Sequence, residues 1–179
     1  MSNQDGLLFK VASNVKLFHG IQKQNLIQLL SCANKVTIKD GALFFDEGAY
    51  GESFYVLVTG KAAVEKEIDG TWQQVAMLEA GDSFGEMTLV FDEKIRSARI
   101  KAVGDCLALY FEGLHLKQIH PNLLSTLFHN IARVIAGRLK ATNIELSHVK
   151  LKLSKVLGKA EPKADPKADP KMPTKDSHQ

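Results

Sequence analysis

The sequence is poor in the residues that form covalent cross-links or bind metals. It has two cysteines, Cys32 and Cys106, which lie far apart and form no CxxC pair. We expect both to be buried, reduced thiols rather than a disulfide or part of a metal site. No histidine lies between residues 36 and 110. The six histidines are His19, His115, His120, His129, His148 and His178.

The chain also lacks a strong net charge and a long apolar run. The formal net charge is only +3 over 179 residues, and lysine and arginine are spread along the chain. This distribution gives no electrostatic case for binding nucleic acid. Lys10, Ser13, Asn14 and Lys16 interrupt the apolar residues of the N-terminal segment. Without a signal peptide or a membrane-spanning stretch, we expect a cytoplasmic protein that does not bind a membrane.

What the chain does contain is a clear change in the spacing of its apolar residues. Residues 6–33 have helical spacing with a break near residues 18–20, which predicts two short helices. From residue 35 to 111 the period changes to two and glycines recur, which predicts an antiparallel β-roll or barrel. Within this region Thr59-Gly60 and Asp69-Gly70 are predicted to be turns between strands.

Helical spacing returns over residues 112–158, where Pro121 suits the first turn of a helix. We therefore expect one domain over residues 1–158, mainly β with flanking helices. The repeated lysine, acid and proline of residues 159–179 cannot build a core, so this tail is predicted to be disordered. Such a tail either keeps the protein soluble or docks a partner.

The long C-terminal helix carries a seven-residue repeat that is typical of a coiled coil. Its apolar positions step alternately by four and three, with one polar member, Thr142. The repeat consists of Ile135, Leu139, Thr142, Leu146, Val149, Leu153 and Val156. It predicts a homodimer through residues 135–156. The alternative is a helix that packs on its own domain.

Residues 81–100, GDSFGEMTLVFDEKIRSARI, contain the groups that a cyclic phosphodiester of a sugar requires. Gly85 precedes a predicted helical turn at Glu86–Val90, and backbone N–H groups at such a turn attract anions. Arg96, where the chain re-enters a strand, offers a planar charged fork for two phosphate oxygens. Glu86 can accept a hydrogen bond from a ribose hydroxyl. The alternative is an ion pair between Glu86 and Arg96 that only pins a loop.

The order FGE, a short apolar helix and then RSA resembles the phosphate-binding cassette of the cyclic-nucleotide-binding domain family. Residues 48–64 resemble the glycine-bounded strand pair that precedes this cassette. Residues 136–146, AGRLKATNIEL, resemble the dimerisation helix of the catabolite activator type. The resemblance covers about residues 15–157. It implies a jelly-roll-like β-roll (a double-stranded β-helix) with a long C-terminal dimerisation helix.

The resemblance also implies a role for each site residue. Glu86 would accept from the ribose 2′-hydroxyl, and Arg96 would pair with the cyclic phosphate. The backbone amides of Gly85, Ser97 and Ala98 would assist. The other implied contacts are Met87 in the cassette, Val64 and Val75 on an apolar wall, and Thr142 and Asn143 at the base.

Two residues depart from the family's pattern. Thr88 replaces the usual alanine or glycine, which crowds the cassette, and Asn143 replaces a hydroxyl residue at the base. The implied ligand is cAMP. The alternative ligand is cGMP, because Ser97 can reach a guanine amino group. No cofactor is expected besides this ligand.

The expected function is therefore a non-catalytic, dimeric sensor of a cyclic nucleotide. It would pass its signal to a separate protein by movement of the C-terminal helix. An enzyme is disfavoured because metal-binding rolls usually place histidines on their strands. Direct DNA binding is disfavoured because no helix-turn-helix pattern follows the long helix. The remaining alternative is a degenerate domain that acts as a ligand-independent scaffold for other proteins.

Overall fold

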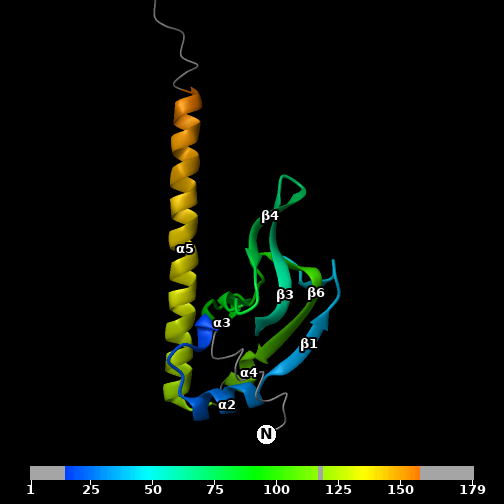
Figure 1. Cartoon of the computed structure of the whole chain (residues 1–179), viewed down its shortest axis with the longest axis vertical. Helices are drawn as coiled ribbons and strands as arrows, with labels where there is room; N and C mark the ends of the chain where they lie inside the picture. The colour runs from blue at the N-terminus through cyan, green and yellow to red at the C-terminus, as the bar shows by residue number, and fades with distance from the viewer. Residues whose placement is uncertain (1–14, 117–118, 158–179) are drawn as a thin grey trace, which may run out of the picture. The chain divides into compact units, whose positions relative to one another are not determined.

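A computed structural model describes residues 15–116 and 119–157 of the chain (Figure 1). The first predicted N-terminal helix falls largely before this range, and the predicted tail over 159–179 also lies outside the described residues. The chain divides into two compact units, Met1–Gly137 and Arg138–Gln179.

The first unit is built on one six-stranded antiparallel sheet. Its strands are β1 (Asn34–Ile38), β2 (Leu43–Phe45), β3 (Ser53–Ile68), β4 (Thr71–Leu78), β5 (Ser83–Phe84) and β6 (Arg99–Glu112). The sheet order is β1-β6-β3-β4, while β2 also pairs with β6 and β5 with β3. The long strands β3 and β6 therefore form the centre of the sheet (Figure 1). This topology confirms the predicted mainly-β roll with flanking helices.

The central strands bury apolar side chains on both of their faces. Side chains of a strand alternate between faces, so Phe54 and Val56 of β3 point to one side and Leu57 to the other. The first face joins a core with Leu109 and Phe111 of β6. The second face joins a separate core lined by aromatic rings, among them Phe44, Phe45 and Phe84. With a core on each face, the strand β3 is continuously apolar from Phe54 to Val58, whereas alternation is expected only where one face meets solvent.

Short helices cover the first of these cores. They are the 3-10 turn η1 (Lys16–Phe18), α2 (Lys23–Ser31), α4 (Gly113–Leu116) and the start of α5 (Pro121–Leu157). Their apolar faces contribute Leu17, Leu29, Leu116 and Leu127 to the core. The helix α5 begins at Pro121, as predicted, but before it Glu112 ends β6 and Gly113–Leu116 form the separate helix α4.

A buried asparagine ties α5 to the N-terminal segment. Asn130 is 3% exposed, and its Nδ2 donates to the backbone oxygens of Leu17 at 3.0 Å and His19 at 2.8 Å. A buried amide with both of its donors used fixes one relative position of the two segments. This contact had no signal in the sequence, because more than a hundred residues separate its partners.

Of the two predicted turns, one is confirmed and one is wrong. Asp69 and Gly70 join β3 to β4 with φ of 51° and 74°, as a tight hairpin turn requires. Thr59-Gly60 is instead a bulge inside β3, where the pairing with β6 changes register. At Gly60, which has φ of 88°, an added Cβ would lie 2.7 Å from the Sγ of Cys106. The glycine thus permits a close approach of two strands rather than a reversal of the chain.

Both cysteines are free thiols. Cys106 is buried, as predicted, and its Sγ donates to the backbone oxygen of Lys61 at 3.0 Å. Cys32 is half-buried, so the expectation of full burial holds for only one of the two.

In the second unit, the described residues continue α5 to Leu157. From Leu139 onward the members of the seven-residue repeat are exposed in the single chain. Leu139 is 60% exposed and Val156 is 66% exposed. In the described part of the chain, none of the helices is long and apolar enough to cross a membrane.

Candidate functional site

The candidate site is the segment from Gly85 to Ala98, called the cassette below. The strand β5 ends at Phe84, and Gly85 turns the chain with φ of 78°. The helix α3 (Met87–Val90) follows directly, which confirms the predicted helical turn. Arg96–Ala98 were predicted to lie in a strand, but β6 begins only at Arg99. The RSA segment is therefore a bend that leads into β6.

Backbone hydrogen bonds fasten the far end of the cassette to the loop that precedes β3. The N–H of Gly48 donates to the Arg96 carbonyl at 2.9 Å, and the N–H of Arg96 donates to the Ala49 carbonyl at 2.8 Å. A third bond runs from the Gly51 N–H to the Lys94 carbonyl at 2.9 Å. These bonds fix the backbone from which the arginine side chain projects.

The side chain of Arg96 is buried, with 4% exposure, and its guanidinium donates to neutral oxygens. Nη1 donates to the Gly85 carbonyl at 3.1 Å and to Thr88 Oγ1 at 3.4 Å. Nη2 donates to Ser53 Oγ at 3.1 Å. Within the described residues, the buried Nε has no hydrogen-bond partner. This guanidinium can therefore still donate a hydrogen bond to a bound anion.

Two glycines and an aromatic ring shape the space around this guanidinium. A Cβ added at Gly51 would lie 2.5 Å from Nη2, and one added at Gly85 would lie 2.6 Å from Nη1. The Phe45 ring stacks over the guanidinium with its centroid 4.1 Å from Cζ. Such a ring stabilises a cation while excluding water. Any other residue at either glycine would push the arginine out of its present position.

Glu86 is the second buried charged residue of the cassette, with 1% exposure. Burial lowers the pKa of Arg96, and the nearby carboxylate of Glu86 acts in the opposite direction. The guanidinium still stays protonated at neutral pH, because the ordinary pKa of arginine is above 12. The cassette thus combines a buried permanent cation with a buried carboxylate, which matches a ligand that carries both an anion and a hydroxyl group.

The other residues of the cassette lie around Arg96 and Glu86. The hydroxyl of Thr88 donates to the Gly85 carbonyl at 2.9 Å and accepts from Arg96, so this departure from the family's pattern is part of the arginine's hydrogen-bond set. Ser97 is exposed, and its Oγ lies 3.7 Å from the Sδ of Met87. The structure therefore brings Met87 and Ser97 together, next to Ala98, which is half-buried.

The residues predicted outside the cassette have more varied surroundings. Val64 is half-buried and packs against the core that contains Phe84. Val75 is 51% exposed and lies where the pairing of β3 with β4 changes register. Thr142 and Asn143 are exposed on the part of α5 that belongs to the second unit. The roles of these four residues in binding stay predictions.

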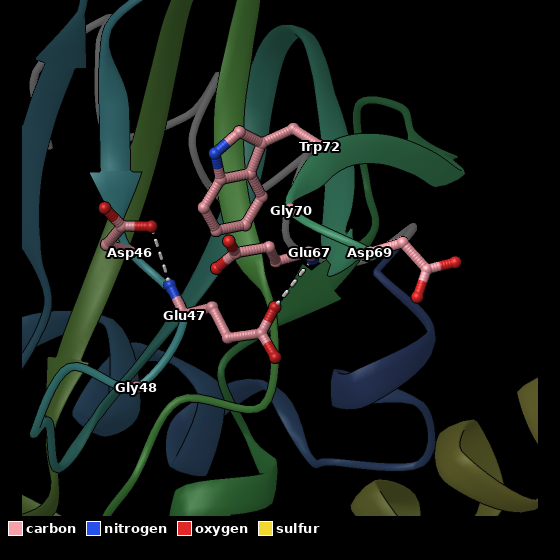
Figure 2. Close-up of a pocket in the computed structure, with 7 residues that line it drawn as sticks. All are labelled: Asp46, Glu47, Gly48, Glu67, Asp69, Gly70 and Trp72. Atoms are coloured by element: carbon pink, nitrogen blue, oxygen red, sulfur yellow. Dashed lines mark hydrogen bonds between the residues drawn. The ribbon is translucent and has the colours of Figure 1, made fainter.

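A pocket with a volume of about 580 Å³ lies between the 46–48 loop and the β3–β4 hairpin (Figure 2). Four acidic residues line it together with two glycines and an indole ring: Asp46, Glu47, Glu67, Asp69, Gly48, Gly70 and Trp72. Arg99 pairs with Asp46 and Lys66 with Glu47, so the cations beside this pocket are already neutralised by its own carboxylates. Among the described residues, no cluster of three or more histidine, cysteine or acidic side chains is arranged to bind a metal ion. The cassette, rather than this pocket, has the chemistry for an anion.

Comparison with known proteins agrees with the geometry. Residues 35–121 match the family described as the cyclic nucleotide-binding domain. This chain belongs to the cyclic-nucleotide-binding domain family. The matched range contains the whole cassette and all six strands except the first residue of β1.

Individual members of the family are similar over longer ranges. The cyclic AMP receptor protein of Thermus thermophilus is 34% identical over 133 residues, which cover 73% of this chain and 60% of that protein. A crystal structure of the Thermus thermophilus catabolite activator protein is 29% identical, with a TM-score of 0.66, and covers 75% of this chain and 63% of that one. A cyclic nucleotide-binding domain from Methylobacillus flagellatus has the same fold, with a TM-score of 0.70 at 21% identity over 78% of this chain and 80% of that one. The chain spans less than two thirds of the two Thermus proteins.

Three residues of this cyclic-nucleotide-binding domain that contact the arginine were missed by the sequence reasoning. They are Phe45, Gly51 and Ser53, which lie before or at the start of β3. Gly51 and Ser53 lie within residues 48–64, where the resemblance implied a glycine-bounded strand pair but no contact with the arginine, and Phe45 lies outside that segment. Their roles arise from strand pairing that brings the start of β3 beside the cassette.

Proposed function

We propose that this cyclic-nucleotide-binding domain binds cAMP and acts as a sensor without catalysing a reaction. The observation that carries the proposal is the state of Arg96. It is a buried, permanently charged side chain that is held by neutral oxygens at one end of the cassette. Glu86 is buried near this cation and compensates part of its charge, but the buried Nε of Arg96 has no hydrogen-bond partner among the described residues. A cyclic phosphate supplies both an acceptor and further negative charge for the guanidinium, and the name of the Thermus thermophilus relative favours cAMP.

We assign the ligand's parts to the predicted residues. Arg96 pairs with the cyclic phosphate, assisted by the amides of Gly85, Ser97 and Ala98. Glu86, which is buried next to this cation, accepts a hydrogen bond from the ribose 2′-hydroxyl. The further contacts in the proposal are Met87, the apolar side chains of Val64 and Val75, and Thr142 and Asn143 at the base.

The proposal includes a homodimer through residues 135–156. Exposed apolar residues at coiled-coil spacing support it, because a single chain leaves Leu139, Leu146, Val149, Leu153 and Val156 each about half exposed or more. Contiguous apolar surface of this kind is uncommon on a monomer. Thr142, as the polar member of the seam, would bring the base to the dimer interface.

The mechanism that we propose is a two-state switch. Ligand binding shifts the equilibrium only if the two states bind the nucleotide with different affinity. Movement of the helical region 112–157 would then carry the signal to a partner protein in the cytoplasm. Amide hydrogen exchange of this region with and without cAMP tests the switch, and unchanged protection would contradict it.

The experiment that tests the proposed function is calorimetric titration of the purified chain with cAMP and, separately, with cGMP. We expect saturable binding at one site per chain, with cAMP bound more tightly. Tighter binding of cGMP would change the messenger but keep the site. If neither nucleotide bound, the fold would instead serve as a ligand-independent scaffold.

A further inference from the structure

Lys66, which is not among the predicted site residues, joins the cassette to the rest of the roll. It lies on β3, and its Nζ donates to the backbone carbonyl of Ser97 at 2.7 Å. The same ammonium group pairs with Oε1 of Glu47. The side chains are 39% and 25% exposed, so the pair is partly protected from water. Lys66 is thus held between the 46–48 loop and the bend that precedes β6.

Glu47 is itself held in place, so it can fix the lysine. Its Oε2 accepts a hydrogen bond from the backbone N–H of Glu67 at 3.2 Å, and its own N–H donates to Asp46 Oδ1 at 2.9 Å (Figure 2). The hydrogen bond from Lys66 is the main cause that lowers the pKa of Glu47. The carboxylate is therefore ionised at neutral pH.

The peptide group between Ser97 and Ala98 gives this contact a consequence for the site. The peptide bonds of residues 15–116 and 119–157 include no cis bond. In a trans peptide the C=O and the N–H point in opposite directions. Lys66 binds the Ser97 carbonyl, so the N–H of Ala98 points away from Lys66. A cation on the carbonyl also polarises the peptide and strengthens its N–H as a donor.

We propose that Lys66, held by Glu47, is a positioning residue that orients the Ser97–Ala98 peptide toward the phosphate of the ligand. This inference rests on the proposed function, because it assigns to Lys66 an indirect role at the same site. The contact is not a simple local one: Lys66 and Ser97 lie 31 residues apart, and Glu47 lies 19 residues from Lys66.

A matched pair on the same strand provides the control. Lys61 of β3 pairs with Glu79 at 2.8 Å, and both side chains are more than half exposed. Neither residue contacts the cassette through a hydrogen bond of the described structure. Lys61→Met and Glu79→Ala therefore make the same chemical changes as Lys66→Met and Glu47→Ala without touching the Ser97 carbonyl.

The test is titration with cAMP of the full chain and of these four variants. We expect Lys66→Met to weaken binding about tenfold, at the lower end of what a charge-assisted hydrogen bond contributes. Glu47→Ala should weaken it about threefold or more, since it releases the lysine. Lys61→Met and Glu79→Ala should stay within about twofold of the wild type, as exposed pairs contribute little.

Glu47→Ala separates positioning from a plain charge effect. Removing a negative charge near the site should tighten the binding of an anion if charge alone matters. Positioning predicts weaker binding instead. The ratio of the cAMP affinities of the wild type and Lys66→Met should also persist at high salt, which screens exposed charges. Lys66→Arg should recover most of the affinity, because arginine can still donate to the Ser97 carbonyl.

The outcomes also separate this inference from the proposed function. If the wild type binds cAMP and Arg96→Ala weakens binding, while the Lys66 and Glu47 variants match their controls, only the positioning role is overturned. Tighter binding by Glu47→Ala overturns it as well. If the wild type binds neither nucleotide, the proposed function itself fails. Thermal unfolding of each variant shows whether it is folded, and Glu47→Ala replaces Lys66→Met as the decisive variant if the latter does not fold.

Discussion

Arg96 donates a hydrogen bond from Nη1 to the backbone carbonyl of Gly85 at 3.1 Å, which joins the two ends of the cassette. The glycine precedes α3 and the arginine follows the charged loop, so this bond closes the segment into a ring. Because Gly85 also packs against the same guanidinium nitrogen, a change at either end alters the position of the other.

Replacing Arg96 should weaken cAMP binding far more than replacing Thr142. Loss of one partner of a buried charged contact costs roughly 2–5 kcal/mol, which is about thirtyfold to several thousandfold in affinity. Loss of one hydroxyl contact costs only about 0.5–1.5 kcal/mol. Titration of Arg96→Ala and Thr142→Ala with cAMP gives both values. Equal affinities for the wild type and Arg96→Ala would refute the proposed site.

Gly85→Ala should lose affinity, whereas Gly81→Ala should not. Both glycines have positive φ, 78° and 94°, so alanine strains the backbone at either position by about 1–2 kcal/mol. Only at Gly85 does the new methyl group meet Arg96; at Gly81 nothing lies within 4 Å. We expect both variants to lose free energy of unfolding, measured in urea, with the larger loss for Gly85→Ala, but an affinity loss of about thirtyfold for Gly85→Ala alone. Comparable cAMP affinities in the two variants would contradict the role of Gly85.

The proposed dimer should depend on Leu146 and not on Leu151. Both are exposed leucines on α5, 48% and 58%, but only Leu146 belongs to the seven-residue repeat. A buried leucine contributes about 1.5–3 kcal/mol, and Leu146→Glu removes one from each subunit. The dissociation constant of the dimer should therefore rise at least about a hundredfold. Sedimentation analysis measures this, with Leu151→Glu as the control; a dimer unaffected by Leu146→Glu would place the interface elsewhere.

Asn130→Ala should destabilise the first unit. The substitution removes the donors for the backbone oxygens of Leu17 and His19. Leaving a buried acceptor without its partner costs about 1–3 kcal/mol. Urea unfolding measures the loss, and Asn122→Ala, at an exposed position of the same helix, should change the free energy of unfolding by less than about 0.5 kcal/mol. Equal stability of the two variants would show that the Asn130 contacts contribute nothing.

The sequence predicted the elements whose signals are local. The short spacing of apolar residues and glycines over residues 35–111 is a local signal of strands, and the cassette motif lies within one short segment. The error at Thr59-Gly60 has a physical reason, because a glycine with positive φ serves a bulge as well as a turn. Only the pairing with β6 distinguishes the two.

The contacts that complete the site could not be predicted in this way. Ser53 lies 43 residues from Arg96, and Lys66 lies 31 residues from Ser97. Nothing in the residues near Ser53 or Lys66 indicates these partners. They follow from the register of β3 against β5 and β6, which is a property of the folded sheet.

The pairing of β3 with β6 also has a consequence for the order in which the protein assembles. Ser53 pairs with Glu112 and Glu65 with Arg99, so the central ladder joins segments that are distant along the chain. Sheets built from such non-local pairs fold slowly, because the intervening chain must be ordered before the contacts form. During synthesis the cassette leaves the ribosome before β6, the strand that immediately follows it. The surroundings of Arg96 therefore form only when the roll closes, and nucleotide binding would report the completion of folding.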